Sequence, residues 1–239
     1  PYGDPAHGSW YPSDEGSIRL GDYGLNSMVI GADAPNDSRF ITGIAHDAMG
    51  RPVTVPRAAA IYEREDGVLW RHGDEALLAR RLVVSQAVTI DNYDFVFSWI
   101  FGNDGAIEVE VRLTGIMTLD PTSATRDTLA SHAEHDSHAH LVAEHVSAPH
   151  HQHFFAYRLD FDIDGASGNR VVELNTDADP IGPENPDGEW FTMHSHVLRT
   201  EQEAMRSTDA TTSRRWRVES TRATNALGQP TAYTLMPGT

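Results

Sequence analysis

The sequence predicts a mainly β protein, an antiparallel β-sandwich, and three observations lead to that prediction. Short runs of β-branched and aromatic residues recur from residue 28 onward. Gly, Pro, Asp or Asn bound nearly every run, as expected for turns between strands. Helical spacing is weak and appears only over residues 74–80 and 199–205. Strands at this spacing with hardly a helix between them are typical of packed antiparallel sheets.

The strands expected in the first half of the chain are short, and one of them differs from the rest. Turn residues separate the expected strands 28–31, 40–44, 58–63, 68–72 and 82–90. The next strand, residues 93–100, is largely apolar on both faces, with Tyr93, Phe95 and Phe97 on one of them. A strand of this kind is expected in the dry interior of a sheet. The turn 102–105 then leads into a strand over 107–113 that has one polar face.

Residues 120–148 form a long insert that is rich in histidine. Five histidines lie in it: His132, His135, His138, His140 and His145. We interpret the insert as a solvated loop and not as a metal site, because no strand pattern holds these rings in place. Later strands are expected over residues 171–174, 215–219 and 231–235. His194 and His196 form another H-x-H pair, which we place on an exposed strand or loop edge.

Composition limits the partners of the chain. The 239 residues are 39% hydrophobic, which is enough to bury a core and suits one large domain or part of one. A formal net charge of -17 repels nucleic acid and membrane surfaces of negative charge, and favours cationic small molecules such as amines. There is no cysteine for a disulfide or a thiolate metal site. No apolar run approaches the ~20 residues of a membrane helix and the start lacks a signal pattern, so we expect a soluble protein of undetermined location.

Two short segments stand out as parts of a candidate metal site. The first is Thr-Ile-Asp-Asn-Tyr-Asp, residues 89–94, in which a tyrosine stands between an amide and a carboxylate. The second is His151-Gln152-His153, in an apolar stretch. Side chains two apart on an extended strand point to the same face, so His151 and His153 can present two imidazole nitrogens to one ion.

These segments resemble two signatures of the copper amine oxidases. Residues 89–94 are similar to the T-x-x-N-Y-(D/E) segment of that family, whose tyrosine is oxidised in place to topaquinone. Residues 148–160 are similar to the family's H-x-H copper strand. The similarity runs more weakly from about Tyr2 to about Thr234, and it does not cover the family's full length. We therefore expect residues 1–239 to be a partial catalytic domain, with both ends cut.

The resemblance implies oxidative deamination of a primary amine by dioxygen, giving an aldehyde, ammonium and hydrogen peroxide. Tyr93 would be the precursor of topaquinone and Asn92 would limit its rotation. His151 and His153 would bind copper, with zinc as the alternative occupant of an imidazole site. The family's third histidine lies beyond residue 239, so we expect the isolated chain to be inactive.

The resemblance leaves several candidates for the catalytic base. The family places it in a D-x-G-E-(Y/F)-x-x-G stretch, and Asp14, Gly16 and Gly21 match that spacing, although Ser17 replaces the glutamate. We prefer Asp14. An offset of one nominates Glu15 instead, and Asp22 is a further candidate. An alignment on residues 21–24 places Arg19 at the base position, which would abolish the chemistry.

The resemblance also implies features outside the copper site. Asp160 and Asp162 share a strand face and match a peripheral metal site, which we expect to take calcium if it is not simply an acidic strand end. The family forms homodimers and often has a disulfide, for which this chain has no cysteine. The rival hypothesis is a non-catalytic β-sandwich that has lost the base and binds metal or serves as an interaction module.

Overall fold

The structure is a computed structural model that describes residues 25–47, 49–90, 92–123, 125 and 139–238. Within these ranges every regular element is a β-strand, and every pairing between the named strands is antiparallel. The predicted mainly β, antiparallel class is confirmed. Among the same residues, no helix is long and apolar enough to cross a membrane.

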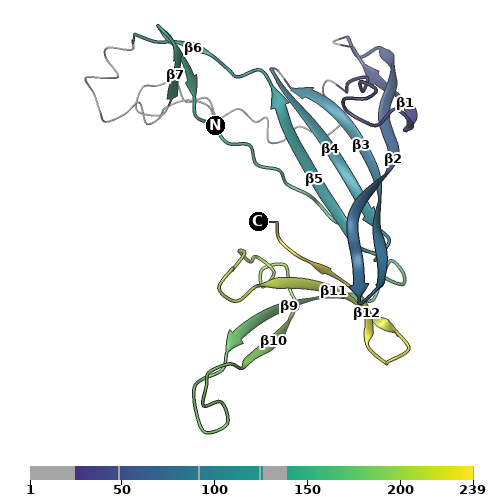
Figure 1. The fold of residues 1–239 in the computed structure, drawn as a ribbon, viewed down its shortest axis with the longest axis vertical. Helices are drawn as coiled ribbons and strands as arrows, with labels where there is room; N and C mark the ends of the chain where they lie inside the picture. The colour runs from purple at the N-terminus through teal and green to yellow at the C-terminus, as the bar shows by residue number, and fades with distance from the viewer. Residues whose placement is uncertain (1–24, 48, 91, 124, 126–138, 239) are drawn as a thin grey trace. The chain divides into compact units, whose positions relative to one another are not determined.

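The chain forms two compact units, residues 1–156 and 157–239. The assignment of residues 1–239 to one partial catalytic domain stays a prediction. The first unit contains a sheet of five strands in chain order (Figure 1). They are β1 (Arg39–His46), β2 (Pro52–His72), β3 (Glu75–Ile90), β4 (Tyr93–Gly102) and β5 (Ile107–Gly115).

Strand β4 has the interior position that its apolar faces predict, because it pairs with β3 on one side and β5 on the other. Its two faces join different clusters of the core. Val96 packs with Met28 and Ala60 on one face, whereas Phe95 and Phe97 pack with Val88 on the other. Both faces are therefore shielded from water over the middle of the strand.

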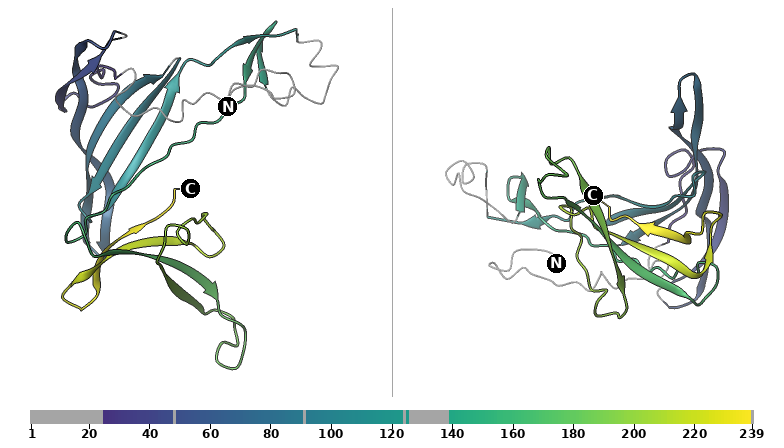
Figure 2. Two further views of the ribbon diagram at one scale, coloured as in Figure 1. Left: turned by 180° about the vertical axis from the view of Figure 1, so that it is seen from behind. Right: turned by 90° about the horizontal axis from the view of Figure 1, so that it is seen from below.

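The β2–β3 hairpin is longer than the sequence analysis predicted. The expected strands 58–63 and 68–72 form one strand, and the stretch 74–80, read as weakly helical, begins β3. The turn explains this, since His72 pairs with Glu75 across two residues and Gly73 takes a left-handed φ of 56°. The far end of this hairpin extends beyond the strands on either side (Figure 2).

The histidine-rich insert contains strands, so its interpretation as a loop was wrong in part. A small sheet joins β6 (Asp120–Pro121), β7 (Ala139–Ala143) and β8 (Val146–Pro149). The hairpin between β7 and β8 forms because His145 adopts a left-handed φ of 63° at its turn, which allows the chain to reverse. Residues 126–138, with three of the five histidines, lie outside the described residues.

The second unit contains a sheet of four strands in the order β10-β9-β11-β12. The strands are β9 (Asn169–Ala178), β10 (Phe191–Leu198), β11 (Arg215–Thr224) and β12 (Pro230–Leu235). His194 and His196 are exposed on β10, which is an edge strand, as interpreted from the sequence. Residues 199–205, read as weakly helical, form turns instead, in which the Glu203 carboxylate accepts the Arg199 N–H and the Thr200 hydroxyl accepts the Glu203 N–H.

Two buried glutamates in this sheet are each paired with two arginines. Glu219 is 1% exposed and accepts hydrogen bonds from Arg170 and Arg217, both at 2.7 Å from Nε. Glu173 is 5% exposed and lies between Arg206 and Arg214. A buried carboxylate is tolerated only with such partners, since it loses its hydration shell.

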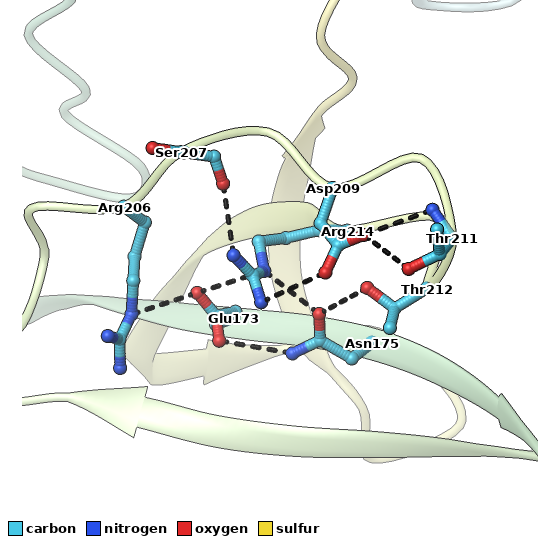
Figure 3. A network of polar contacts seen from close by, with 8 residues as sticks. All are labelled: Glu173, Asn175, Arg206, Ser207, Asp209, Thr211, Thr212 and Arg214. Carbon is cyan, nitrogen blue, oxygen red and sulfur yellow. Dashed lines mark hydrogen bonds and ion pairs between the residues drawn. The ribbon is translucent and has the colours of Figure 1, made fainter.

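The ion pairs of Glu173 with Arg206 and Arg214 connect β9 to the loop that leads into β11 (Figure 3). Its Oε2 lies 3.1 Å from Arg206 Nε and 3.6 Å from Arg214 Nε, as ion pairs rather than aligned hydrogen bonds. Its Oε1 accepts a hydrogen bond of 3.0 Å from the Asn175 side chain. The Oδ1 atom of Asn175 accepts from Arg214 and from the Thr212 hydroxyl, both at 2.9 Å.

The loop end of this network is also fixed by polar contacts. Arg214 donates to the Ser207 carbonyl at 3.0 Å and pairs with Asp209 at 3.5 Å. The hydrogen bond from the Thr211 hydroxyl holds the pKa of Asp209 below its ordinary value. Arg214 therefore joins the strand residues of the network to the loop.

We expect Glu173→Gln to destabilise the protein by about 2 kcal/mol, because two partly buried arginines lose their counter-charge. Urea unfolding measures this change. Glu184→Gln is the matched control, since Glu184 is exposed, and it should change the stability by less than about 0.5 kcal/mol. Equal unfolding midpoints for the two variants would contradict the role given to Glu173.

Candidate active site

Tyr93 is the first residue of β4 and follows a two-residue hairpin connection. The register pairs Ile90 with Tyr93 and Thr89 with Asp94, so Asn92 lies in the turn. The Thr89 hydroxyl donates to the Asp94 carboxylate, and the Asn26 side chain donates to the Thr89 hydroxyl. The outer residues of the Thr-x-x-Asn-Tyr-Asp segment thus tie the two strands together beside the tyrosine.

One face of β4 contacts one side of the extended segment 151–155, and we refer to this contact as the aromatic seam. Alternate residues form each side of it: Tyr93, Phe95 and Phe97 on β4, and His151, His153 and Phe155 opposite. Successive ring centroids are 5.0 Å apart for Tyr93–His151, 5.2 Å for Tyr93–His153, 5.3 Å for Phe95–His153, 5.8 Å for Phe95–Phe155 and 5.9 Å for Phe97–Phe155. These separations are typical of favourable aromatic contacts.

The seam brings the two histidines together next to the tyrosine. The centroids of His151 and His153 are 4.9 Å apart with the rings nearly perpendicular, and both contact Tyr93. The Nδ1 atom of His151 lies 3.1 Å from the Pro149 carbonyl oxygen. A hydrogen bond from Nδ1 to this carbonyl orients the ring, as is common for imidazoles that bind metal ions. The pair therefore fits an ion that accepts imidazole, such as copper or zinc.

The strand predicted from His151 is not formed, although the predicted alternation of its side chains is present. Residues 151–162 make no ladder with another strand. The reason lies in β4, whose backbone is already paired on both edges. The histidine segment can therefore reach Tyr93 only across the face of the sheet, through its side chains.

The structure describes the predicted peripheral ligands but not the predicted base. Among the described residues, no group of three or more His, Cys, Asp or Glu side chains is placed to hold a metal ion, so the two histidines form a pair. Asp160 and Asp162 are exposed, and a calcium site there stays a prediction. Asp14 lies outside the described residues, as do its alternatives and Arg19.

The sequence analysis missed one segment that contacts Tyr93, residues 115–118. The Thr118 N–H donates to the Tyr93 hydroxyl oxygen at 3.2 Å, and the Asn92 side chain donates to the Ile116 carbonyl and to the Thr118 hydroxyl. The available signal was Gly115, which ends β5 directly opposite Tyr93. A glycine at that position indicates a close approach of two backbones.

A tyrosine packed against two imidazoles on a β-sheet is a donor set that suits a redox metal such as copper as well as zinc. The model of the family described as copper amine oxidase, enzyme domain, matches residues 1–239. The chain belongs to the copper amine oxidase family, which confirms the resemblance seen in its sequence, and proteins of this family depend on copper.

Individual relatives agree with this assignment. Histamine oxidase of Arthrobacter globiformis is 37% identical over 99% of the chain, and primary amine oxidase of Klebsiella aerogenes is 30% identical over 99% of it. A copper-containing benzylamine oxidase of Hansenula polymorpha has the same fold, with a TM-score of 0.73 over 90% of the chain at 23% identity. The chain spans 34%, 32% and 34% of these three proteins, which is about a third of their length.

The seam predicts that two adjacent phenylalanines contribute unequally to the stability of the protein. Phe155 packs against Phe95 and Phe97 and is 39% exposed, whereas Phe154 points away and is 76% exposed. We expect Phe155→Ala to lower the free energy of unfolding by about 1–2 kcal/mol, and Phe154→Ala to change it by less than about 0.5 kcal/mol. Denaturant unfolding of both variants measures this difference. Equal losses would show that segment 151–155 does not pack in this register.

Proposed function

We propose that the full-length protein oxidatively deaminates primary amines: an amine, dioxygen and water give an aldehyde, ammonium and hydrogen peroxide. The observation that carries this proposal is the contact of one tyrosine ring, Tyr93, with both His151 and His153. The family assignment supports the same reaction, since relatives are named for the oxidation of amines. The proposal concerns the whole protein, because the chain spans about a third of its relatives.

We further propose that His151 and His153 hold copper and that Tyr93 is the precursor of topaquinone. Copper bound there would supply the redox chemistry that converts the tyrosine to a quinone and returns electrons to dioxygen. Zinc accepts the same imidazoles but has no redox chemistry, so the occupant decides between an enzyme and a structural site.

The surrounding residues support this role by position and by exclusion of water. Phe95, Phe97 and Phe155 form the apolar continuation of the seam, which limits the access of water to the tyrosine from that direction. Asn92 holds the segment that contacts the Tyr93 hydroxyl. A carboxylate base, which we assign to Asp14, would take the α-proton of the substrate.

The charge of the chain supports a cationic substrate. Protonated amines carry a positive charge, and a formal charge of -17 raises their concentration near the protein. The same charge opposes nucleic acid and anionic membranes as partners. Relatives of the chain include a copper-containing diamine oxidase of Nicotiana tabacum, 34% identical over the whole chain.

We also propose a peripheral calcium site and a homodimer for the full-length protein. Calcium at Asp160 and Asp162 is supported by two exposed carboxylates two residues apart in an acidic stretch that continues to Asp164. A homodimer is supported by the free end of the β2–β3 hairpin. Its exposed large apolar side chains are Val68, Trp70, Leu77 and Leu78.

The copper assignment is tested with three histidine variants of the full-length protein. We expect His151→Ala and His153→Ala each to weaken copper binding by at least about 100-fold and to prevent quinone formation, because each removes a direct ligand. His150→Ala is the control, since alternation places this exposed side chain on the opposite side of the segment. Stoichiometric copper in the His151→Ala, His153→Ala double variant would refute the assignment.

The base is tested by separating cofactor formation from turnover. We expect Asp14→Asn in the full-length protein to form the quinone normally and to stop turnover at reduction of the cofactor by substrate, because only proton removal needs the carboxylate. Stopped-flow absorbance under anaerobic conditions measures that reduction, with Glu15→Gln and Asp22→Asn as matched variants. Normal turnover by Asp14→Asn would transfer the role to whichever of the other two variants fails.

A further inference from the structure

We propose that residues 115–118 are a backbone clamp that sets the ring orientation of Tyr93, and that Thr118 is a positioning residue acting through its main-chain N–H. This inference rests on the proposed role of Tyr93 as a quinone precursor. We name Gly115, Ile116, Met117 and Thr118 together the Thr118 clamp. The clamp contains no imidazole and no carboxylate, so we assign its effect to geometry.

The first support is the contact at the tip of the ring. The Thr118 N–H donates to the Tyr93 hydroxyl oxygen at 3.2 Å, while His151 and His153 contact the same ring at centroid distances of 5.0 Å and 5.2 Å. Ring contacts alone allow a tyrosine to tilt about its side-chain torsions. A hydrogen bond at the hydroxyl, the atom farthest from the backbone, restricts that tilt most effectively.

The direction of this hydrogen bond leaves the phenol proton available. The hydroxyl oxygen is the acceptor, because a backbone N–H can only donate. The contact with the clamp therefore does not use the hydroxyl hydrogen of Tyr93. A backbone donor is also fixed in place by the chain and has no rotamer by which it could leave the ring.

The second support is that Asn92 holds the clamp on both of its sides. The Ile116 N–H donates to the Asn92 carbonyl at 2.7 Å. The Asn92 side-chain amide donates to the Ile116 carbonyl and to the Thr118 hydroxyl, the latter at 3.0 Å. Asn92 therefore acts on the tyrosine through space, by fixing Thr118, as well as through the peptide bond that joins it to Tyr93.

The third support is the absence of a side chain at Gly115, which pairs with Tyr93 in the register of β4 and β5. Its φ is +111°, a conformation that other residues rarely adopt. A Cβ there would lie 2.6 Å from the Asn92 carbonyl oxygen and 2.7 Å from the Tyr93 Cα. Only glycine lets β5 end this close to the hairpin turn, so only glycine lets the clamp reach the ring.

Ring orientation matters because oxidation to a quinone occurs at particular carbons of the ring. The two imidazoles would set the place of a metal, and the clamp fixes the direction of the ring axis and the place of the hydroxyl beside them. Misplacement of reacting groups by about 1 Å costs roughly 100-fold in rate. We therefore expect the clamp to govern the rate of cofactor formation more than the affinity for the metal.

The main experiment compares Thr118→Pro with Thr118→Ala in the full-length protein. Proline removes the N–H donor, so we expect copper to bind as in the wild type but quinone absorbance to develop about 100-fold more slowly. Alanine keeps the N–H and loses only the hydroxyl contact with Asn92, so its rate should stay within about tenfold of the wild type. Quinone formation by Thr118→Pro at the wild-type rate would overturn the inference.

A second measurement needs neither copper nor activity. In the metal-free full-length protein, Tyr93→Phe removes the acceptor, and we expect amide hydrogen exchange at Thr118 to become about 2- to 10-fold faster, as for the loss of one hydrogen bond. Tyr62→Phe is the matched control, because Tyr62 packs in the separate cluster around Met28. Unchanged exchange at Thr118 in Tyr93→Phe would overturn the inference even where the Thr118→Pro protein fails to fold.

The two measurements separate this inference from the proposed function. A wild-type protein that binds copper and forms no quinone refutes the proposed function, whereas the exchange experiment still decides whether Thr118 holds the Tyr93 hydroxyl. Gly115→Ala provides an independent variant, since its Cβ would push the clamp from Tyr93. Faster exchange at Thr118 in Gly115→Ala supports the inference, and unchanged exchange contradicts it.

Discussion

The candidate site depends on one packing interaction, the aromatic seam between β4 and the segment 151–155. Because β3 and β5 occupy both edges of β4, the histidine segment can meet Tyr93 only by side chains across the face of the sheet. The alternation of an extended chain then decides which residues arrive there. A shift of one residue would present His150 and Gln152 in place of the histidine pair. The contacts of Phe155 with Phe95 and Phe97 belong to the register that presents both imidazoles.

The tyrosine on the other side of the seam is restrained from several directions by its own hairpin. The Thr89 hydroxyl and the Asp94 carboxylate close the hairpin on the face away from the ring. Asn92 occupies the turn and holds the Thr118 clamp, which in turn holds the Tyr93 hydroxyl. The Thr, Asn and Asp of this segment therefore have positional roles, which explains why these residue types accompany the tyrosine.

The sequence predicted which side chains share one face of a strand better than it predicted which strands pair with each other. Period-two alternation placed Tyr93, Phe95 and Phe97 on one face and His151 with His153 on another, because that pattern is a local property of an extended chain. The strand expected at His151 is not formed, and β4 cannot pair with it because β3 and β5 occupy both edges of β4. Residues 74–80 mix residue types that suit helix and strand. The turn at Gly73 reverses the chain so that residues 75–80 pair with β2, which favours the strand. The Thr118 contact uses a main-chain N–H, which no residue identity reveals.

The measurement that tests the central claim most directly is the chemical state of residue 93 in full-length protein loaded with copper and exposed to air. The account predicts visible absorbance and quinone redox staining in the wild type, located by mass spectrometry to the peptide that contains Tyr93, and loss of both signals in Tyr93→Phe. An unmodified Tyr93 in protein that holds stoichiometric copper would contradict the account and leave a metal-binding β-sandwich without this chemistry.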